Sequence, residues 1–173
     1  MFDHRIPLRF SILTSISILA LWGLIPVTPA QEATMEDRCR QEVVELHQFF
    51  TQWFNGELTN DDASFARLAK ALGPDFEIIG PDAHRLGQEA VLGAIRSGHG
   101  GRAEGGFAIE VKNVQSRSVG GGLVLVTYEE HQTRAGQVRA WQSSALFRDL
   151  PGNPNDVQWI HVQETYLPGL GGS

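Results

Sequence analysis

The apolar residues change their spacing once along the chain, and this change limits the possible folds more than any other feature. Between residues 35 and 97 they recur at steps of three and four, the period of one face of an α-helix. From residue 107 to residue 166 they mostly alternate with polar residues, the period of a half-buried β-strand. Helices followed by a run of strands predict an α+β protein whose helices gather on one face of the sheet.

Three helices are expected before residue 98. The first spans 35–55, ends at Gly56 and carries an apolar stripe of Val43, Leu46, Phe50 and Trp53. The second begins after the N-cap oxygens of residues 60–62 and stops at Gly73-Pro74. A short strand, DFEIIG at 75–80, precedes a third helix that opens near Gly87 and ends at Ser97-Gly98.

Four strands are expected in the second half of the chain. They begin at Phe107, at GGLVLVTYEEHQ (121–132), at QVRAWQSSALF (137–147) and at VQWIHVQETYL (157–167). The links between them are short turn sequences, so the four strands should form an antiparallel meander. The second of them is apolar on both faces over its first half, which predicts a central strand covered on both sides.

The N-terminus has the pattern of a secretory signal peptide. Arg5 and Arg9 precede an apolar run at 10–27, and the small residues of 28–30 offer a cleavage site. A retained membrane anchor is the alternative, because the run is near the roughly 18 residues that span a bilayer. We therefore expect a signal peptide at 1–30, an N-terminal extension at 31–37, one domain at 38–167 and a flexible tail at 168–173, in a secreted or periplasmic protein.

The charge of the chain argues against nucleic acid as a partner. The net charge is -6, and removing residues 1–30 leaves 12 basic and 19 acidic residues, a charge of -7. An acidic surface repels phosphate backbones. Cys39 is the single cysteine, so no internal disulfide can form, and no Cys/His array has the spacing of a zinc site. No metal and no cofactor are expected, and no membrane association after cleavage.

Five segments together resemble the nuclear transport factor 2-like superfamily, and most closely its SnoaL-like and uncharacterised branches. They are FEIIGPD (76–82), GQEAVLGAI (87–95), VLVTYEEHQ (124–132), SSALF (143–147) and WIHVQETYL (159–167). The resemblance covers roughly residues 38 to 167. It implies a curved antiparallel sheet wrapped around about three helices, with a pocket at the open end of the cone. Some members are isomerases, dehydratases, cyclases or epoxide hydrolases, and others bind partners or assemble, so the fold does not select a function.

Many members of this superfamily carry two histidines on the last strand, in a W…HxH-like pattern. Trp159 and His161 fit this pattern, but Gln163 stands where the second histidine is expected. A site with paired imidazoles is therefore not complete in this chain.

Two strands carry the candidate catalytic residues. Tyr128 and Glu130 share one face of their strand, because side chains alternate. Tyr128 could polarise a ligand carbonyl and Glu130 could move protons, or Tyr128 could be a satisfied core residue with Glu130 near a solvated strand end. His161 is an alternative acid or base, or else a packed core histidine.

Further residues are candidates for ligand binding. Alternation places Trp159, His161 and Gln163 on one face of the last strand, opposite Val162 and Glu164. The other candidate pocket residues are Tyr128, Trp141, Ser143 and His84. His84 follows Gly80-Pro81-Asp82, which is turn chemistry, so it either reaches a ligand at the pocket mouth or belongs only to the turn.

Three functions fit these observations. The first is an exported domain, most simply a homodimer, that holds a small apolar or amphipathic ligand in the cone. The second is a proton-transfer enzyme of isomerase or dehydratase type that uses His161, Glu130 and Tyr128. The third is a dimeric partner-binding module of the cell envelope. Whether the protein is an enzyme is left open by the sequence.

Overall fold

A computed structural model describes residues 32–170 of the chain. The expected signal peptide lies outside these residues. The elements, in chain order, are α1 (Met35–Asn55), α2 (Asp62–Ala71), β1 (Leu72–Ile79), β2 (Arg85–Gly87), α3 (Gln88–Ser97), β3 (Ala108–Gly120), β4 (Leu123–Arg134), β5 (Gln137–Asp149), the short 3₁₀ helix η1 (Pro154–Asp156) and β6 (Val157–Tyr166). None of the helices in this part of the chain is long and apolar enough to cross a membrane.

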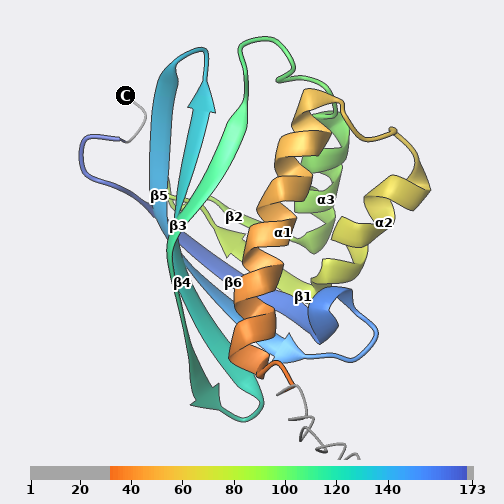
Figure 1. Ribbon diagram of the computed structural model, residues 1–173, viewed down its shortest axis with the longest axis vertical. Helices are drawn as coiled ribbons and strands as arrows, with labels where there is room; N and C mark the ends of the chain where they lie inside the picture. Colours follow the sequence, from red (N-terminus) through yellow and green to blue (C-terminus); the bar gives the residue numbers. More distant parts are fainter. Residues whose placement is uncertain (1–31, 171–173) are drawn as a thin grey trace, which may run out of the picture. The chain divides into compact units, whose positions relative to one another are not determined.

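The strands form one six-stranded sheet in the order β2-β1-β6-β5-β4-β3. The antiparallel meander β3-β4-β5-β6 is confirmed. The sheet is mixed, however, because β1 pairs in parallel with β6 and antiparallel with β2. The sheet curves around the helices, and α1 lies across its inner face (Figure 1). The architecture is therefore the expected α+β arrangement with helices on one side.

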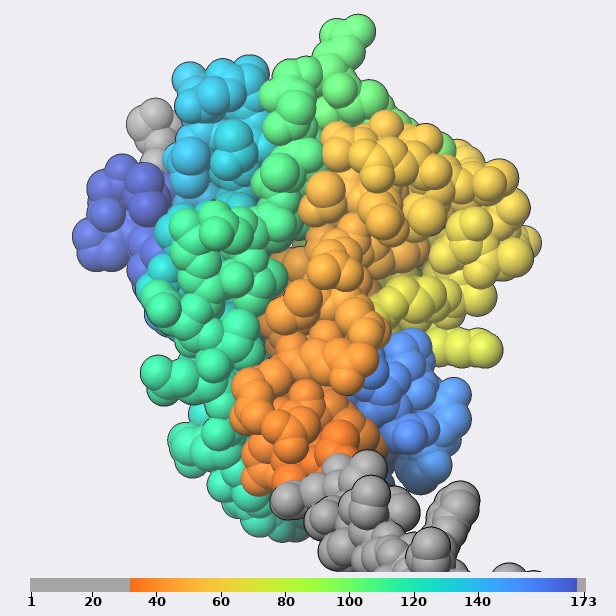
Figure 2. Space-filling model, viewed as in Figure 1, coloured from red at the N-terminus to blue at the C-terminus, as the bar shows by residue number. Residues whose placement is uncertain are grey.

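The first helix begins and ends where its capping residues predict. The Thr34 side chain accepts a hydrogen bond from the Asp37 backbone N–H, and the Asp37 carboxylate accepts one from the Thr34 N–H. Gly56 ends the helix in the left-handed conformation, with φ of 73°. In the space-filling view α1 (orange) fills the strip between the β3–β4 hairpin (green) and α2 (yellow) (Figure 2).

The core lies between α1 and the inner face of the sheet. It joins the predicted stripe of α1 to alternate residues of β4, β5 and β6, among them Val126, Tyr128, Ala145, Phe147 and Trp159. Burying such side chains removes apolar surface from water and is the main favourable contribution to folding. The helix periodicity and the strand alternation therefore meet in one contiguous core.

Two local expectations are wrong. Gly73-Pro74 does not separate α2 from a later strand, because α2 ends at Ala71 and β1 already starts at Leu72. The ladder between β1 and β6 shifts register between Leu72 and Glu77, and an irregular stretch of this kind tolerates a proline. The apolar strand β4 is also not covered on both sides by residues 32–170, since Leu123 and Leu125 on its outer face are partly exposed.

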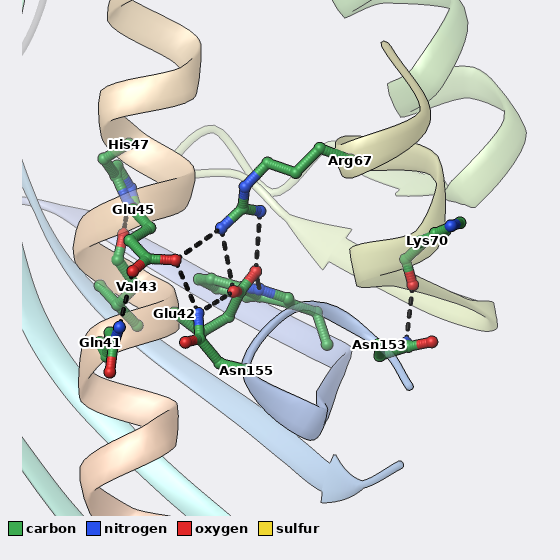
Figure 3. Close-up of polar contacts among 10 residues, drawn as sticks. Gln41, Glu42, Val43, Glu45, His47, Arg67, Lys70, Asn153 and Asn155 are labelled. Atoms are coloured by element: carbon green, nitrogen blue, oxygen red, sulfur yellow. Dashed lines mark hydrogen bonds and ion pairs between the residues drawn. The ribbon is translucent and has the colours of Figure 1, made fainter. Parts of the chain in front are cut away.

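A buried carboxylate ties α1 to three other elements, and no pattern along the chain predicts these contacts. Glu42 is completely buried, and both of its oxygens accept hydrogen bonds from Arg67 of α2 at 3.0 Å (Figure 3). The same carboxylate accepts hydrogen bonds from Asn155 of η1 at 2.8 Å and from the Trp159 indole of β6 at 3.2 Å. A buried charge is tolerated only when it is paired and hydrogen-bonded in this way.

Removing the two partners of this ion pair should have unequal effects. Arg67→Gln leaves a fully buried carboxylate without its counter-charge, and we expect a loss of about 3–5 kcal/mol in the free energy of unfolding. Glu42→Gln leaves a guanidinium that is 24% exposed and can turn to water, so its cost should be about 1–2 kcal/mol. Urea unfolding measures both values.

Arg40→Gln is the matched control, because Arg40 pairs with Asp37 on the surface of α1. Its cost should be below about 1 kcal/mol. Equal costs for Arg67→Gln and Glu42→Gln would contradict the assignment of Glu42 as the buried member of the pair.

Candidate functional site

A cavity of about 230 Å³ lies between the inner face of the sheet and helices α1 and α3. We call it the cone cavity. Its apolar lining is Leu46, Phe50, Phe54, Leu72, Phe76, Ile78, Val91, Ile95, Ile109, Trp159 and Val162, and its polar lining is His47, Arg102, Tyr128, Glu130, Gln132 and Glu164. Apolar walls with a few convergent polar groups are typical of sites for small molecules.

The centre of the polar lining is a buried pair of His47 on α1 and Glu130 on β4. His47 Nε2 lies 3.1 Å from a Glu130 carboxylate oxygen, and the two residues are only 3% and 7% exposed. His47 Nδ1 lies 2.6 Å from the Val43 carbonyl oxygen, which can only accept, so Nδ1 carries a proton and donates it there. The contact between Nε2 and the carboxylate therefore needs a second proton, which the two groups share.

The charges of the pair support each other. Burial disfavours the charged form of His47, but the charge of Glu130 and the hydrogen bonds to Glu130 and Val43 outweigh it and raise the pKa of the imidazole. Burial likewise disfavours the charged Glu130, but the charge and hydrogen bond of His47 and the hydrogen bond of Gln132 lower the pKa of this carboxyl. Both pKa directions and the contact geometry favour an imidazolium paired with a carboxylate.

The hydrogen bonds continue from Glu130 to the edge of the cavity. Gln132 Nε2 donates to the other Glu130 carboxylate oxygen at 2.6 Å. The Arg102 guanidinium donates to the side-chain oxygen Oε1 of Gln132 at 3.1 Å. The chain from Val43 through His47, Glu130 and Gln132 to Arg102 is thus continuous. Because every link uses a specific donor and acceptor, it fixes the orientation of each side chain.

Glu164 of β6 is a second carboxyl in the same cavity. Burial and the nearby charges of Glu130 and Asp82 raise the pKa of Glu164 to about 7, although the charge of His47 acts in the opposite direction. Glu164 therefore exchanges its proton near neutral pH, while Glu130 stays ionised. Two neighbouring carboxyls with different protonation states are an arrangement that can move protons.

Tyr128 lies beside these carboxyls on β4 and is 2% exposed. Burial and the charges of Glu130 and Glu164 raise the pKa of the Tyr128 hydroxyl well above its ordinary value. The hydroxyl consequently keeps its proton and can donate a hydrogen bond. Tyr128 and Glu130 therefore lie together in the cone cavity.

An extra residue in β6 changes which side chains of that strand face inward. Trp159 pairs with Phe147 and His161 with Leu146, so two residues of β6 lie opposite one residue of β5. This β-bulge at Ile160 reverses the alternation that follows it. Trp159, Val162 and Glu164 all line the cavity, and the expected common face of Trp159, His161 and Gln163 does not exist.

His161 and Gln163 accordingly lie outside the cone cavity. His161 is among the half-buried residues of β6, and its Nδ1 lies 3.7 Å from the Glu77 carboxylate of β1. Gln163 donates a hydrogen bond to the backbone carbonyl of Glu164 at 3.1 Å. The structure therefore does not bring His161 together with Glu130 and Tyr128, and the missing second histidine of the W…HxH-like pattern does not concern the cavity.

The remaining candidates are divided between the mouth and the surroundings of the cavity. A hollow of about 200 Å³, lined by Trp141, Asp82 and Tyr166 among others, shares Glu130, Gln132 and Glu164 with the cone cavity. We call it the mouth. Ser143 is fully buried and lies directly opposite Tyr128 in the β4–β5 ladder. The Trp159 indole lines the cavity while donating its N–H to Glu42.

His84 belongs to the turn before β2. Its side chain is 81% exposed, and its ring lies 3.3 Å from the Asp82 carboxylate. The Asp82 side chain also accepts a hydrogen bond from the His84 backbone N–H, as expected for a turn. Pro81 and Asp82, and not His84, are the residues of this link that line the mouth.

Sequence reasoning missed four polar residues of the cone cavity: His47, Arg102, Gln132 and Glu164. His47 offered a signal, because it stands four residues after Val43 on the apolar side of the first helix. Regular alternation placed Glu164 on the opposite face of its strand, which only a bulge could change. Arg102 lies in a glycine-rich loop without periodicity. Within residues 32–170 there is no group of three or more His, Cys, Asp or Glu side chains that could hold a metal ion.

Comparison with known proteins places the chain in a family. The model described as sucrose-6-phosphate phosphohydrolase C-terminal matches residues 39–168. No curated protein matches the chain significantly.

Solved structures share the fold at low sequence identity. An NTF-2-like protein of unknown function from Pseudomonas aeruginosa has 22% identity and a TM-score of 0.66, covering 75% of this chain and 98% of its own. An NTF2-like protein from Cytophaga hutchinsonii has 15% identity and a TM-score of 0.55, with 78% and 100% covered. The CaMKII hub of S. rosetta has 8% identity and a TM-score of 0.59, with 78% and 98% covered. The fold is that of the NTF2-like superfamily.

The raised pKa of Glu164 predicts a pH-dependent loss of stability. The folded state keeps a proton that the unfolded chain releases above pH 4.5, so this contribution is complete below pH 4.5 and is lost as the pH rises through about 7. Between pH 4.5 and 7.5 we expect wild type to lose about 1–2 kcal/mol more than Glu164→Gln, allowing for partial exposure of the carboxyl. Urea unfolding across this range measures the difference.

Glu89→Gln is the control, because Glu89 is exposed on α3 and lies outside the cavity. It should follow the wild-type profile. Parallel profiles for wild type and Glu164→Gln would show that Glu164 does not hold a proton in the folded state.

Proposed function

This chain belongs to the sucrose-6-phosphate phosphohydrolase C-terminal family, and from its NTF2-like fold and cone cavity we propose that it binds a small apolar or amphipathic molecule. The observation that carries the proposal is an apolar hollow of about 230 Å³ that ends at an ionised Glu130 and a titrating Glu164. The apolar body of the ligand would lie against α1 and α3.

The polar groups restrict what the ligand presents at the carboxylate end of the cone cavity, where Glu130 and Glu164 lie. Glu130 already accepts hydrogen bonds from His47 and Gln132, and its negative charge repels an anion. Protonated Glu164 and Tyr128 are left as donors, and ionised Glu164 as an acceptor. A neutral hydroxyl or carbonyl group matches these partners, whereas a carboxylate or phosphate does not.

Binding of small probes tests this function. We expect 1-octanol or cyclohexanone to raise the melting temperature, because a ligand at one hundred times its Kd stabilises by about 2.7 kcal/mol. Val91→Phe places a larger side chain of α3 in the cone cavity and should raise the Kd, measured by calorimetry, by about tenfold. Val44→Phe adds the same side chain at an exposed position of α1 and should leave the Kd unchanged. No stabilisation by any neutral probe would remove the proposal.

A second candidate function is proton transfer on a bound carbonyl compound, with Glu164 as the acid or base and Tyr128 as the hydrogen-bond donor. The pKa of about 7 for Glu164 favours it, because an acid or base is most effective when its pKa is near the working pH. Exchange of deuterium into cyclohexanone beside its carbonyl, followed by NMR, should fall about 100-fold in Glu164→Gln. Exchange no faster than in buffer would exclude it.

We also propose that the domain is a dimeric partner-binding module of the cell envelope that uses the outer face of the sheet. Leu123 and Leu125 of β4 and Leu146 of β5 are partly exposed there, and a hub domain shares the fold. Leu146→Glu should convert a dimer into a monomer in light scattering, and Val119→Glu, at an already exposed residue of β3, should not. A monomeric wild-type protein would contradict this proposal.

Export is proposed from the sequence pattern of residues 1–30, in which basic residues precede an apolar run and small residues follow it. The predicted product is a secreted or periplasmic protein that begins at Gln31. Mass spectrometry of the protein from the producing cell decides between this product and a chain that keeps its first 30 residues.

A further inference from the structure

A second cavity, of about 360 Å³, adjoins the cone cavity and is lined by arginines. We call it the arginine pocket. Its lining is Arg102, Phe107, Gln132, Arg134, Ala135, Gln137 and Arg139. The glycine-rich loop at 98–107 and the tip of the β4–β5 hairpin form it, and both lie at the same end of the sheet (Figures 1 and 2). The Ala135 backbone N–H donates to the Gly105 carbonyl oxygen at 2.7 Å and joins the two segments.

The three arginines of this pocket differ from most others in the protein. Within residues 32–170, six of the ten arginines form ion pairs with Asp or Glu, namely Arg38, Arg40, Arg67, Arg85, Arg96 and Arg148. Among residues 32–170, no Asp or Glu carboxylate forms an ion pair with Arg102, Arg134, Arg139 or Arg117. Three of these four, Arg102, Arg134 and Arg139, line the arginine pocket. In an acidic chain, this concentration of arginines without a paired carboxylate favours an anion.

Arg102 is held in place before any anion arrives. Its guanidinium carbon lies 4.3 Å from the ring centre of Phe54 and 4.5 Å from that of Phe107. Its side chain donates to Gln132, and its backbone N–H donates to the Phe54 carbonyl oxygen at 2.9 Å. A fixed guanidinium loses little conformational freedom when it binds an anion.

The strand register directs the other groups to the same cavity. Gln132 lies directly opposite Arg139, and Arg134 directly opposite Gln137, so all four share one face of the β4–β5 hairpin. That face continues the face of Tyr128 and Glu130 toward the hairpin tip. Burial and the nearby charge of Arg134 lower the pKa of Arg102, although the charge of Glu130 acts in the opposite direction. An entering anion would relieve the repulsion between the two arginines.

We propose that the arginine pocket binds the anionic head group, a carboxylate, phosphate or sulfate, of an amphipathic ligand whose apolar body occupies the cone cavity. The proposal rests on the binding function given above and names the class of ligand. Arg102 and Gln132 line both cavities, so the head group lies at the edge of the cone cavity. Guanidinium groups match the oxygens of all three kinds of anion.

The division of charge explains the orientation of such a ligand. At the carboxylate end of the cone cavity, Glu130 and Glu164 disfavour an anion, while at the hairpin tip the arginines favour one. The ligand therefore enters with its apolar or neutral end toward the carboxylates.

Calorimetry of the full-length protein, with probes of similar alkyl chain length, tests the proposal. The probes are 1-octanol, octanoate, octyl phosphate and octyl sulfate, each below its micelle concentration, with inorganic phosphate as a head group without a chain. We expect at least one anionic probe to bind about tenfold more tightly than 1-octanol, with a Kd that weakens as salt is added. Arg134→Gln and Arg139→Gln should each remove most of this gain and leave the Kd of 1-octanol unchanged.

Arg117→Gln is the matched control, because Arg117 also lies without an ion pair in the described residues but belongs to β3 outside the arginine pocket. It should leave every Kd unchanged. Equal affinities for 1-octanol and all anionic probes would overturn the anion site while leaving the binding function intact. Arginine-dependent binding of octyl phosphate or phosphate without any binding of 1-octanol would support the anion site and count against the cone ligand. Anionic binding that Arg117→Gln weakens as much as Arg134→Gln would overturn the site as a general charge effect.

Discussion

The hydrogen-bonded pair of His47 and Glu130 determines which acidic groups of the cone cavity are ionised. The Val43 carbonyl fixes the ring of His47, so the imidazole can only meet Glu130 as a hydrogen-bond donor. Glu130 is thereby held ionised in a place where an isolated carboxyl would be protonated. Its charge in turn helps Glu164 to keep a proton near neutral pH. One ion pair therefore favours the ionised form of Glu130 and the protonated form of the neighbouring Glu164.

This pair depends on the exact placement of α1, and the buried Glu42 supplies that placement. Glu42 stands five residues before His47 on the same helix and binds groups from α2, η1 and β6. One of them, Trp159, also lines the cone cavity. Because of the bulge at Ile160, β6 directs Trp159 toward Glu42 and also directs Glu164 into the cavity. Trp159 and Glu164 are five positions apart, so regular alternation would have placed them on opposite faces of the strand. Fold stability and site geometry are thus carried by the same helix and the same strand.

The sequence predicted the parts of the fold that depend on local chemistry. The stripe of α1, its Gly56 cap, the start of α3 and the β3-β4-β5-β6 meander all follow from spacing and turn residues. The parallel pairing of β1 with β6 was not predicted, because it joins segments about 80 residues apart and leaves no local pattern.

The site was predictable only in part, for the same physical reason. Tyr128 and Glu130 were found because regular alternation holds along β4. His161 and Glu164 were placed on the wrong faces because the bulge inserts one residue without a glycine or other sequence signal. The partners of His47 and Glu42 come from distant elements, and a polar residue on an apolar stripe does not by itself reveal its partner.

The cone therefore has a carboxylate end, with Glu130 and Glu164, and an arginine end at the arginine pocket. His47 keeps Glu130 of the carboxylate end ionised. The most direct test of this account is nitrogen-15 NMR of the His47 ring at pH 7. The account predicts that both ring nitrogens are protonated and that Glu130→Gln removes the proton from Nε2. An Nε2 that is already unprotonated in the wild-type protein would contradict it.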